Sequence, residues 1–563
     1  MLYFAHVSLR VMDSFYRSLK QKGFEGDIDN SDGTRQAYSH DASLFELIPQ
    51  VVVFPKNDAD LQRLVAAVNE GRGEIPGLSL TARSAGTCMS GGAINESVIV
   101  DFPKYFNVIE EVTAHSAHTQ PGVFYRDFEK ATLAQGALMP SFPASRELAS
   151  VGGMVANNSG GEKSLEFGKT ENFVMQLEVV LSDGKTYTLK PLNKEELDAK
   201  KAQKNFEGDY YRKMFTLLDN NYDQIKKAKP HVSKNSTGYN LWDVWNRETG
   251  VFDLTKLFVG SQGTLGLVSD IHFSLINDKP HSGMLVVFMK KKNMDSLGDL
   301  INTVVAKKPA SFEAFDNYTL ELAIKFFPYF RKTLGWIGLF KLGLQLLPDA
   351  FLMFRGIPKM VLLIEFTGET LEEVTQKIKE MHQILKPYKL EAMEEESTEA
   401  KSFKFRIIRR ESFNLLRKKI KDKHTAPFID DMVVPPPRLA EFLPKLQAII
   451  KKYKLMATIA GHMGDGNFHV IPLMKIEEPA ERAKLAPAMK EVNQLVLSYG
   501  GSLSGEHNDG MIRGPWLTQM YGPQIVDLFK QTKQIFDPAN IFNPHKKTDA
   551  TWDFSMSHIR EKF

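Results

Sequence analysis

The chain has 563 residues, of which 43% are hydrophobic and 25% charged, and its formal net charge is only +3. This is the composition of a globular protein with a large core, and so small a charge imbalance gives no support to nucleic-acid binding. Cys88 is the single cysteine, which excludes an internal disulfide and a cysteine-ligated zinc or iron–sulfur centre within this chain.

Helical and strand patterns alternate in the first half of the chain. Apolar residues at helical spacing, after a residue suited to capping, predict a helix over 58–70. Short apolar runs predict strands at 98–102 and 267–275. Asp183-Gly184 lies between two further strand patterns and predicts a hairpin over 177–189. Together these elements indicate an α+β sheet domain.

The middle of the chain has longer helical patterns and more lysine. Strands are predicted at 284–288 and 361–366, and an apolar stripe predicts a helix over 439–453. A further amphipathic pattern over 525–535 predicts a helix in the tail, which ends at an Asp-Pro pair.

Glycine clusters interrupt the first half at 83–92, 152–161 and 260–266. Consecutive small residues let backbone amides face a phosphate, and glycine permits close approach and positive φ. The first cluster is neither a Walker loop nor a GxGxxG fingerprint, and by itself it would equally fit a structural turn. Three clusters in one half favour a large phosphorylated cofactor that several loops touch.

Four stretches of the sequence, taken in chain order, resemble the motifs of one known family. Over about residues 45–545, the chain is similar to the vanillyl-alcohol-oxidase (PCMH-type) superfamily, in the branch that holds D-lactate dehydrogenases and the D-type subunits of glycolate oxidase. The stretches are RSAGTCMSGG, PASRELASVGGMVANNSGGEKSLEFGKT, KNSTGYNL and LFVGSQGTLGL. The resemblance implies an α+β fold with a PCMH-type FAD-binding domain of two α/β subdomains over 1–276. It also implies a ferredoxin-like cap for the substrate over 277–505 and a C-terminal segment, 506–563, that packs back on the FAD domain.

The resemblance implies that the first cluster holds the pyrophosphate of FAD and that the other two flank its flavin and adenine parts. Some relatives attach FAD covalently through a histidine in the first loop, but no histidine occurs in 83–92, so binding here is expected to be non-covalent. Cys88 occupies a position where glycine is common, and we interpret it as a small buried thiol. The residues expected to contact FAD are Arg83, Ser84, Ala85, Gly86, Thr87, Cys88, Ser90, Gly91, Pro143, Ser145, Gly152, Gly153, Asn157, Ser159, Gly160, Gly263, Thr264, Gly266 and Asn543.

Two histidines and a carboxylate form a second candidate site. His462 and His469 are seven residues apart with glycines between them, so a loop or bulged strand must orient them, and Glu506-His507 follows later. Two imidazoles and a carboxylate suit a divalent metal and leave positions open for substrate. The alternative is that these histidines are structural: they would be buried and would hydrogen-bond to carboxylates, with no metal.

The stretches GHMGDGNFH and SGEHNDG resemble the cap motifs of D-2-hydroxy-acid dehydrogenases. The resemblance implies that His462, His469 and Glu506 hold zinc or manganese and that His507 acts as the catalytic base beside the flavin. A metal acidifies the hydroxyl of a chelated 2-hydroxy acid, and a neutral histidine takes the proton. Asn508-Asp509 departs from the common Gly-Ile, and the extra carboxylate is expected to alter substrate preference or the pKa of His507.

Ile408-Arg409-Arg410-Glu411 resembles a family segment whose arginine binds the substrate carboxylate, and the resemblance implies Arg409 as this anchor, with Arg410 as the alternative. A guanidinium suits a carboxylate because it can form two hydrogen bonds with it. A solvated helix face would carry the same residues. Relatives specific for D-2-hydroxyglutarate have a lysine near the position of Ile429. Its absence favours a monocarboxylate such as D-lactate, although Lys423 or His424 could substitute.

A hydrophobic insert over 326–360 is rich in aromatic and aliphatic residues interrupted by Lys and Arg. It would suit an interfacial membrane helix or a helical hairpin packed on the cap. No secretion signal or uncharged spanning run is found. We expect a cytoplasmic location, with the insert as a candidate contact to the inner face of the cell membrane.

The sequence therefore predicts an FAD-dependent dehydrogenase that oxidises a D-2-hydroxy acid by hydride transfer to flavin N5, with D-lactate as the expected substrate. A quinone, a cytochrome or an electron-transfer protein is expected to accept the electrons. The alternatives are a D-2-hydroxyglutarate or glycolate dehydrogenase, a non-catalytic flavoprotein subunit, and an alkyl-ether-lipid synthase, which the SGEH motif fits poorly.

Overall fold

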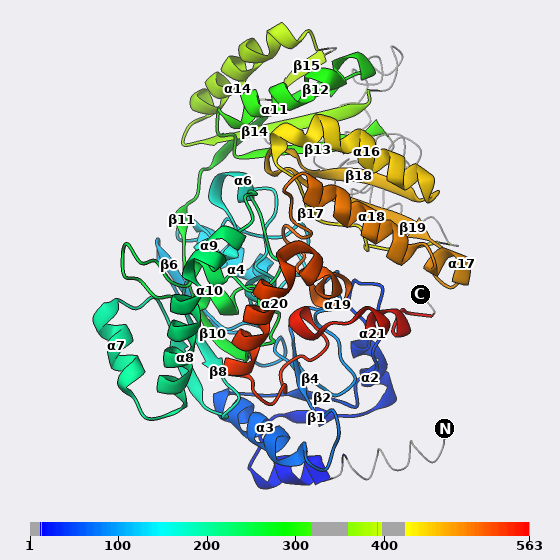
Figure 1. Cartoon of the computed structure of the whole chain (residues 1–563). Helices are drawn as coiled ribbons and strands as arrows, with labels where there is room; N and C mark the ends of the chain where they lie inside the picture. Colours follow the sequence, from blue (N-terminus) through cyan, green and yellow to red (C-terminus); the bar gives the residue numbers. More distant parts are fainter. Residues whose placement is uncertain (1–11, 13, 318–357, 391, 397–422, 562–563) are drawn as a thin grey trace.

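The computed structural model describes residues 12, 14–317, 358–390, 392–396 and 423–561. The described residues form three sheets of four or more strands and one two-stranded pair. Two of the three lie in the N-terminal half, and the largest lies at the far end of the molecule (Figure 1). The fold is mixed α/β, and segments far apart in the sequence meet between the sheets. Within the described residues, no helix is both long and apolar enough to cross a membrane. The hydrophobic insert lies outside them, apart from its last three residues.

The first sheet is small and mostly parallel. Its strands, in spatial order, are β1 (Asp27–Asp29), β2 (Val51–Phe54), β4 (Val98–Asp101) and β3 (Leu80–Arg83). Every residue of β2 and β4 is buried, as expected for parallel strands covered on both faces. Helix α3 (Asp58–Gly71) begins where the Asn57 side chain accepts from the Asp60 amide, and it packs its apolar stripe on this sheet. The predicted helix over 58–70 and strand over 98–102 are confirmed.

The second sheet is antiparallel. Its strands, in spatial order, are β5 (Ile109–Val112), β6 (Ser116–Thr119), β10 (Leu267–Ser274), β8 (Val174–Val180) and β9 (Thr186–Leu189). The predicted hairpin is β8–β9, and Gly184 has the positive φ of +76° that its turn requires. β10 confirms the strand predicted at 267–275 and returns late in the chain to lie between β6 and β8.

Helices surround these two sheets (Figure 1). The chain's helices here are α2 (Asp32–Tyr38), α4 (Tyr125–Leu133), α5 (Val151–Asn157), α6 (Ser164–Phe167), α7 (Lys194–Ala202), α8 (Phe206–Asn220), α9 (Tyr222–Ala228) and α10 (Thr255–Phe258). A short pair, β7 (Ala137–Leu138) and β11 (Ile276–Asn277), precedes the connection to the third sheet.

The third sheet, which we call the cap sheet, is antiparallel throughout. Its strands, in spatial order, are β15 (Ala392–Glu396), β12 (His281–Met289), β14 (Met360–Gly368), β13 (Ser311–Asp316), β18 (Met456–His462), β19 (Asn467–Met474) and β16 (His424–Thr425), with β17 (Met432–Val433) also on β19. The strands predicted at 284–288 and 361–366 are confirmed as parts of β12 and β14.

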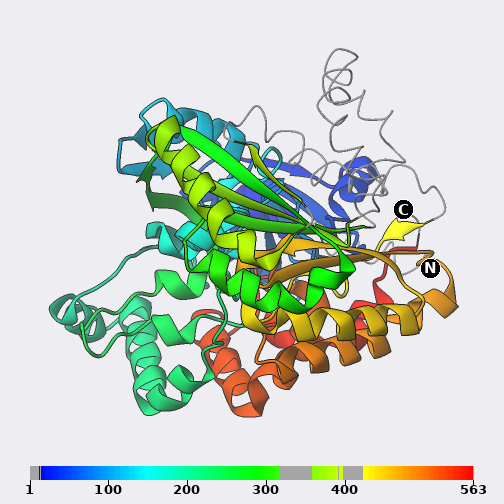
Figure 2. The same cartoon turned by 90° about the horizontal axis from the view of Figure 1, so that it is seen from above.

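Helices cover one face of the cap sheet (Figure 2). They are α11 (Leu297–Val305), α14 (Leu371–Leu385), α16 (Leu439–Lys452) and α18 (Leu485–Ser498), with the short α17 (Pro479–Arg482) before α18. Ile459, Phe468 and Val470 join these helices in one core. Since side chains alternate along a strand, the residues between them, such as Ala460 and His469, belong to the opposite face.

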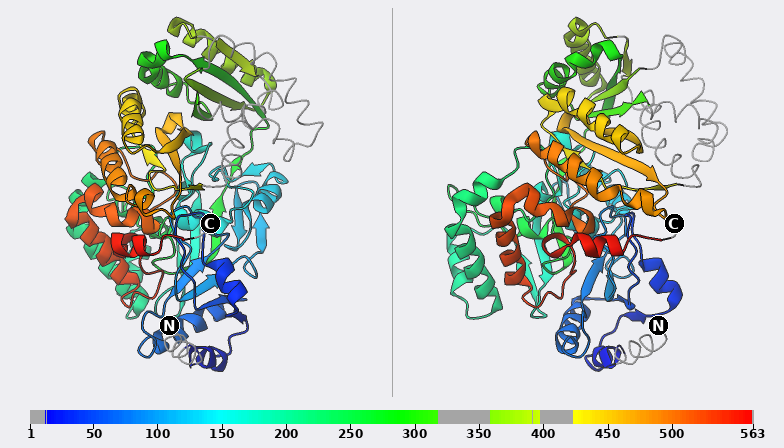
Figure 3. Two further views of the ribbon diagram at one scale, coloured as in Figure 1. Left: turned by 90° about the vertical axis from the view of Figure 1, so that its right-hand side faces the viewer. Right: turned by 45° about the vertical axis from the view of Figure 1, so that its right-hand side comes forward.

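The last segment returns to the N-terminal half. It contains α19 (Gly510–Arg513), α20 (Leu517–Phe536) and α21 (Trp552–Ser557). The predicted tail helix is confirmed within α20, which is kinked at Gly522, where φ is +75° and Pro523 follows. Phe529 and Phe536 of α20 pack on Tyr239 and Phe258, so the tail closes the core of the second sheet. Figure 3 shows this return from two further sides.

Candidate active site

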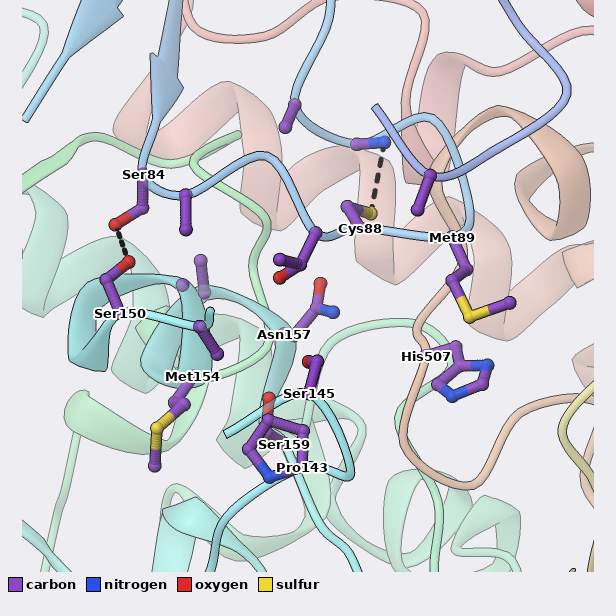
Figure 4. A pocket seen from close by; sticks show the side chains of 18 of the residues that line it. Ser84, Cys88, Met89, Pro143, Ser145, Ser150, Met154, Asn157, Ser159 and His507 are labelled. Atoms are coloured by element: carbon purple, nitrogen blue, oxygen red, sulfur yellow. Dashed lines mark hydrogen bonds between the residues drawn. The ribbon is translucent and has the colours of Figure 1, made fainter. Parts of the chain in front are cut away.

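A cavity of about 950 Å³ lies between the N-terminal sheets and the open face of the cap sheet. This volume is at the upper end of the range for small-molecule and cofactor sites. All three glycine clusters contribute to its wall, and residues of β18 and β19 close it on the cap side. In Figure 4, side chains from the first cluster, from α5 and from 143–159 surround one space, with His507 at its edge.

The first glycine cluster follows β3 directly, at the carboxyl end of a parallel strand, where α/β folds commonly bind ligands. Arg83 lies against the cavity, but its guanidinium donates to the carbonyls of Ala93, His40 and Tyr38, so it organises the surrounding backbone. Gly86 has a φ of +66°, and a Cβ there would lie 2.5 Å from that guanidinium. The tight loop therefore requires glycine at this position.

The second glycine cluster differs from the loop that was predicted. Residues Val151–Asn157 form helix α5, and the chain leaves it through Asn158 in the left-handed conformation. Gly152 packs against Pro121, where a Cβ would lie 2.6 Å from the carbonyl oxygen. Ser150, just before the helix, hydrogen-bonds to Ser84 of the first cluster (Figure 4). Glycine is needed here because the helix packs closely on Pro121. The clustered glycines in the sequence predicted a loop instead.

Gln262, in the third glycine cluster, links that cluster to the other two. It was not predicted from the sequence. Its side-chain amide donates to Ser90 at 3.1 Å and to Asn157 at 3.3 Å, and its Oε1 accepts from the amide of Gly510. Asn543 donates to the carbonyls of Gln262 and Gly92. The only sequence signal for Gln262 was its place between the glycines of the third cluster.

Most of the residues expected to contact FAD line the cavity. They are Arg83, Ser84, Ala85, Gly86, Thr87, Cys88, Pro143, Ser145, Gly152, Gly153, Asn157, Ser159, Gly160, Gly263 and Gly266. Ser90, Gly91, Thr264 and Asn543 do not line the cavity, and the side chains of Ser90, Thr264 and Asn543 form hydrogen bonds that support the loops. Cys88 is half-buried, accepts from the amide of Gly92, and has a thiol pKa raised by desolvation.

Gly153 offers a test of cofactor binding. A Cβ there would meet only Ser150 and Ser84, both at 3.6 Å, so the fold accepts a side chain while the cavity loses space. We expect Gly153→Val to weaken FAD binding by about 1–3 kcal/mol, the usual cost of overpacking, or roughly five- to 150-fold in Kd. Titration of apoprotein with FAD measures this. Gly152→Ala should instead lower the midpoint of thermal unfolding, because its Cβ would meet the Pro121 backbone.

The two histidines of the cap lie on one β-hairpin. His462 ends β18 and pairs with Asn467, the first residue of β19, while His469 pairs with Ala460. His462 and His469 are therefore diagonal neighbours on one face of the sheet, within reach of each other. The hairpin closes at Gly466, where φ is +67° and a Cβ would lie 1.8 Å from the carbonyl oxygen of Val434. The loop or bulge that was predicted to orient the histidines is this tight hairpin.

Three imidazoles converge on one carboxylate. Glu506 Oε1 lies 3.3 Å from His462 Nε2, 3.4 Å from His469 Nε2 and 3.9 Å from His507 Nε2. The rings of His469 and His507 stack with centroids 5.0 Å apart. The fold thus brings together the four residues that the sequence placed in two motifs.

Carboxylates orient all three rings through their other nitrogens. Glu313 of β13 lies 2.6 Å from His462 Nδ1, and Asp430 lies 3.1 Å from His469 Nδ1 and 2.7 Å from His507 Nδ1. Such carboxylate–histidine pairs direct Nε2 toward a metal or a substrate. Neither carboxylate was predicted, because both partners come from strands and loops distant in sequence.

Asp431 holds the backbone that carries Glu506 and His507 in place. Its φ is +67°, in the left-handed region. The side chain of Asp430 contacts the histidine rings, whereas that of Asp431 contacts backbone amides. Its carboxylate accepts from the amides of Glu506 and His507 and from the side chain of Asn467. The sequence analysis assigned no role to Asp430 or Asp431 and considered only the position of the neighbouring Ile429. Ile429 is buried in the cap core and does not line the cavity.

Lys234, from the stretch KNSTGYNL, is a buried lysine that contacts Glu506 directly. Only 1% of it is exposed, and Nζ lies 3.1 Å from Asp465 Oδ2 and 3.3 Å from Glu506 Oε2. Burial acts to raise the pKa of Glu506, but Lys234 and His462 hold it well below the usual range. Burial lowers the pKa of His469, yet Asp430 and Glu506 outweigh it and raise that pKa to about 10.

The site carries excess negative charge when its imidazoles are neutral. Among the described residues around the histidines, five buried carboxylates face three buried cationic side chains. The carboxylates belong to Glu313, Asp430, Asp431, Asp465 and Glu506, and the cations to Lys169, Lys234 and Arg513. A divalent cation would neutralise the two remaining charges. One ligand atom from each of Asp431, His469, Glu506 and His507 lies within 4.8 Å of the others, and His462 Nε2 lies 3.3 Å from Glu506 Oε1.

The contacts of Asp509 and His424 test two further expectations from the sequence. Asp509 was expected to act on His507, but its carboxylate accepts from Lys547 at 2.7 Å and from the Gly238 amide. Its charge is thus neutralised away from the cavity wall. His424, considered as a substitute substrate anchor, pairs through Nε2 with Glu477 at 3.1 Å. Arg409 and Arg410 lie outside the described residues.

Comparison with known proteins agrees with this architecture. Residues 49–190 match the family model "FAD binding domain", and residues 282–547 match "FAD linked oxidases, C-terminal domain". The chain is 27% identical over 548 residues to D-2-hydroxyglutarate dehydrogenase of Pseudomonas putida, but this covers 94% of the chain and only 51% of the relative. The chain thus spans about half the length of the first curated relatives it matches.

Other relatives are matched over nearly their whole length. Glycolate oxidase subunit GlcD of Bacillus subtilis is 28% identical, with 92% of this chain and 93% of the relative covered. D-lactate dehydrogenase of Archaeoglobus fulgidus is 25% identical, with 88% and 90% covered. The structure of 4-ethylphenol oxidase from Gulosibacter chungangensis shares the fold, with a TM-score of 0.66, 14% identity and coverage of 96% and 98%. The chain therefore belongs to the FAD-linked oxidases of the vanillyl-alcohol-oxidase (PCMH-type) superfamily.

Proposed function

We propose that this chain is an FAD-dependent dehydrogenase that oxidises a D-2-hydroxy acid to the 2-oxo acid, with D-lactate as the preferred substrate. The observation that carries the proposal is the convergence of three imidazoles and Glu506 on one wall of the cavity. Such a wall can bind the hydroxyl and carboxylate of a small acid and remove a proton. FAD bound in the cavity would supply the acceptor for the C2 hydride.

His507 is the residue that we assign to proton removal. Asp430 occupies its Nδ1, which leaves Nε2 to accept the proton of the substrate hydroxyl. All three histidines line the cavity, and the His507 side chain is about one-fifth exposed whereas that of His462 is buried. The hydroxyl proton passes to Nε2, and loss of the C2 hydride completes the oxidation to the keto acid.

His462, His469 and Glu506 would hold a divalent metal, zinc or manganese. The fit is good, because two Nε2 atoms face one carboxylate oxygen, each ring is oriented by a second carboxylate, and the surroundings carry excess negative charge. When bound, the ion would make the chelated hydroxyl more acidic.

Metal removal tests this assignment. We expect exhaustive dialysis against a chelator to reduce turnover of D-2-hydroxy acids at least tenfold, because mutation of a residue that only orients a metal ligand already costs about 10–100-fold in metal affinity or activity. Added zinc or manganese should restore turnover. FAD content should stay constant, since the glycine clusters do not depend on the ion. Full activity of protein shown to be metal-free would contradict the assignment.

The cap side of the cavity favours a small, uncharged substituent. Thr425, Thr458, Ala460 and Ile471 line it beside the histidines, and no described cap residue on the wall is a lysine or arginine. A second carboxylate would find no lysine or arginine among these described residues to offset the cost of its desolvation. This supports D-lactate, with Arg409 proposed as the anchor of the single carboxylate.

D-2-hydroxyglutarate and glycolate are the competing substrates, because relatives that bear those names match the chain at 27% and 28% identity. Anaerobic titration of the FAD-bound protein with D-lactate, L-lactate, D-2-hydroxyglutarate and glycolate decides among them. We expect D-lactate to bleach the flavin at the lowest concentration and the highest rate, and L-lactate to leave it oxidised. If no acid bleaches it, the chain is a non-catalytic flavoprotein subunit. The electron acceptor is proposed to be a quinone, a cytochrome or an electron-transfer protein.

A further inference from the structure

A second group of metal-binding side chains lies on the antiparallel sheet of the N-terminal half. His118 on β6 and His272 on β10 are directly opposite each other in the strand register. Asp270 precedes His272 by two residues and shares its half-exposed face of β10. None of the three lines the cavity described above. The sheet therefore presents two imidazoles and a carboxylate at a separate place.

These side chains converge as those of the active site do. Asp270 Oδ1 lies 2.5 Å from His118 Nε2 and 3.6 Å from His272 Nε2. One ligand atom from each of the three residues lies within 4.8 Å of the others. The two rings stack with centroids 3.9 Å apart and an angle of 18° between their planes. Both Nε2 atoms therefore face the same carboxylate oxygen.

A further carboxylate orients one of the rings. Glu110 Oε2 lies 3.0 Å from His118 Nδ1. The register of β5 on β6 shifts between Ile109 and Glu111, so Glu110 is the extra residue of a bulge beside His118. Glu110 thus contacts Nδ1 of His118 while Asp270 contacts its Nε2, which repeats the relation of Glu313, His462 and Glu506.

The neighbouring charges favour a cation. Glu178 on β8 is opposite Asp270 in the register, which adds a third carboxylate to the same part of the sheet. Within the part of the chain that the structure describes, no lysine or arginine forms an ion pair with Glu110, Glu178 or Asp270.

We propose that His118, Asp270 and His272 bind a divalent transition metal of the zinc type. Two imidazole nitrogens and one carboxylate oxygen are a common zinc ligand set with one open position. The side chains of His118, His272 and Asp270 are 26%, 36% and 15% exposed, so an ion and its remaining water can enter from solvent. The ion would link β6 to β10, and thereby fasten the β5–β6 hairpin to the strand that follows the third glycine cluster.

The test measures zinc stoichiometry in tag-free, FAD-bound protein. After equilibrium dialysis against zinc, the variant His118→Gln/His272→Gln should retain one equivalent less than wild type, and its zinc-induced rise in thermal midpoint should shrink. His115→Gln, an exposed histidine in the turn between β5 and β6, is the matched control and should behave as wild type.

A second set of variants distinguishes zinc bound at this site from zinc bound at the active site. In the variant His462→Ala/His469→Ala one zinc should remain, and adding Asp270→Asn to that variant should abolish it. Asp270→Asn alone preserves the shape of the side chain, so it reports on the ion even if the double histidine variant fails to fold. Unchanged zinc stoichiometry in Asp270→Asn and His118→Gln/His272→Gln would overturn the proposal, whatever the outcome for hydroxy-acid oxidation.

Discussion

Replacing His507 with alanine is expected to slow reduction of the bound flavin by D-lactate about 10²–10⁴-fold, the range over which a positioned general base contributes. The reason is geometric: Asp430 holds Nδ1 at 2.7 Å, so Nε2 is the only ring atom left to take the hydroxyl proton. The FAD-contacting clusters are untouched by this change. Stopped-flow measurement of the reduction rate at saturating substrate isolates the chemical step from binding.

Two comparisons make this result specific. His382→Ala removes a histidine that pairs with Glu395 on the cap surface, and it should leave the reduction rate unchanged. Imidazole added to the His507→Ala protein should restore part of the rate by acting as the missing base. An unaltered rate in His507→Ala would assign the base to another residue, with His469 the nearest candidate.

Replacing Lys234 with methionine is expected to cost about 3–5 kcal/mol of unfolding free energy, the usual effect of removing one partner from a buried ion pair. Lys234 is 1% exposed and lies within 3.3 Å of carboxylate oxygens of both Asp465 and Glu506. Without its charge, two buried carboxylates lose their main compensation. Urea denaturation followed by tryptophan fluorescence measures the loss.

The matched control is Lys229→Met, whose ion pair with Asp243 is exposed at the surface. Such pairs are worth at most about 1 kcal/mol. Since a divalent cation would compensate Glu506 in place of the lysine, added zinc should recover more stability in Lys234→Met than in wild type. Equal losses in the two variants would show that the charge of Lys234 is not needed to balance the site.

Local patterns predicted the helices and strands well where one residue pattern dominates. The apolar stripes over 58–70 and 439–453 became α3 and α16, because burial of one helix face requires that spacing. The pattern failed at 152–161, where glycines that were interpreted as a loop instead allow α5 to pack on Pro121. Close packing and loop flexibility both select glycine, so composition does not distinguish them.

The linear order of residues was enough to identify the chemical groups that this protein can use: three glycine clusters in order, His462 and His469 on one short segment, and Glu506 beside His507. How these groups act together depends on the folded chain. Glu313, Asp430 and Lys234 come from distant strands and loops to meet the histidines. Their roles depend on strand register and burial, which set distances and desolvation between groups remote in sequence, and no local pattern encodes those quantities.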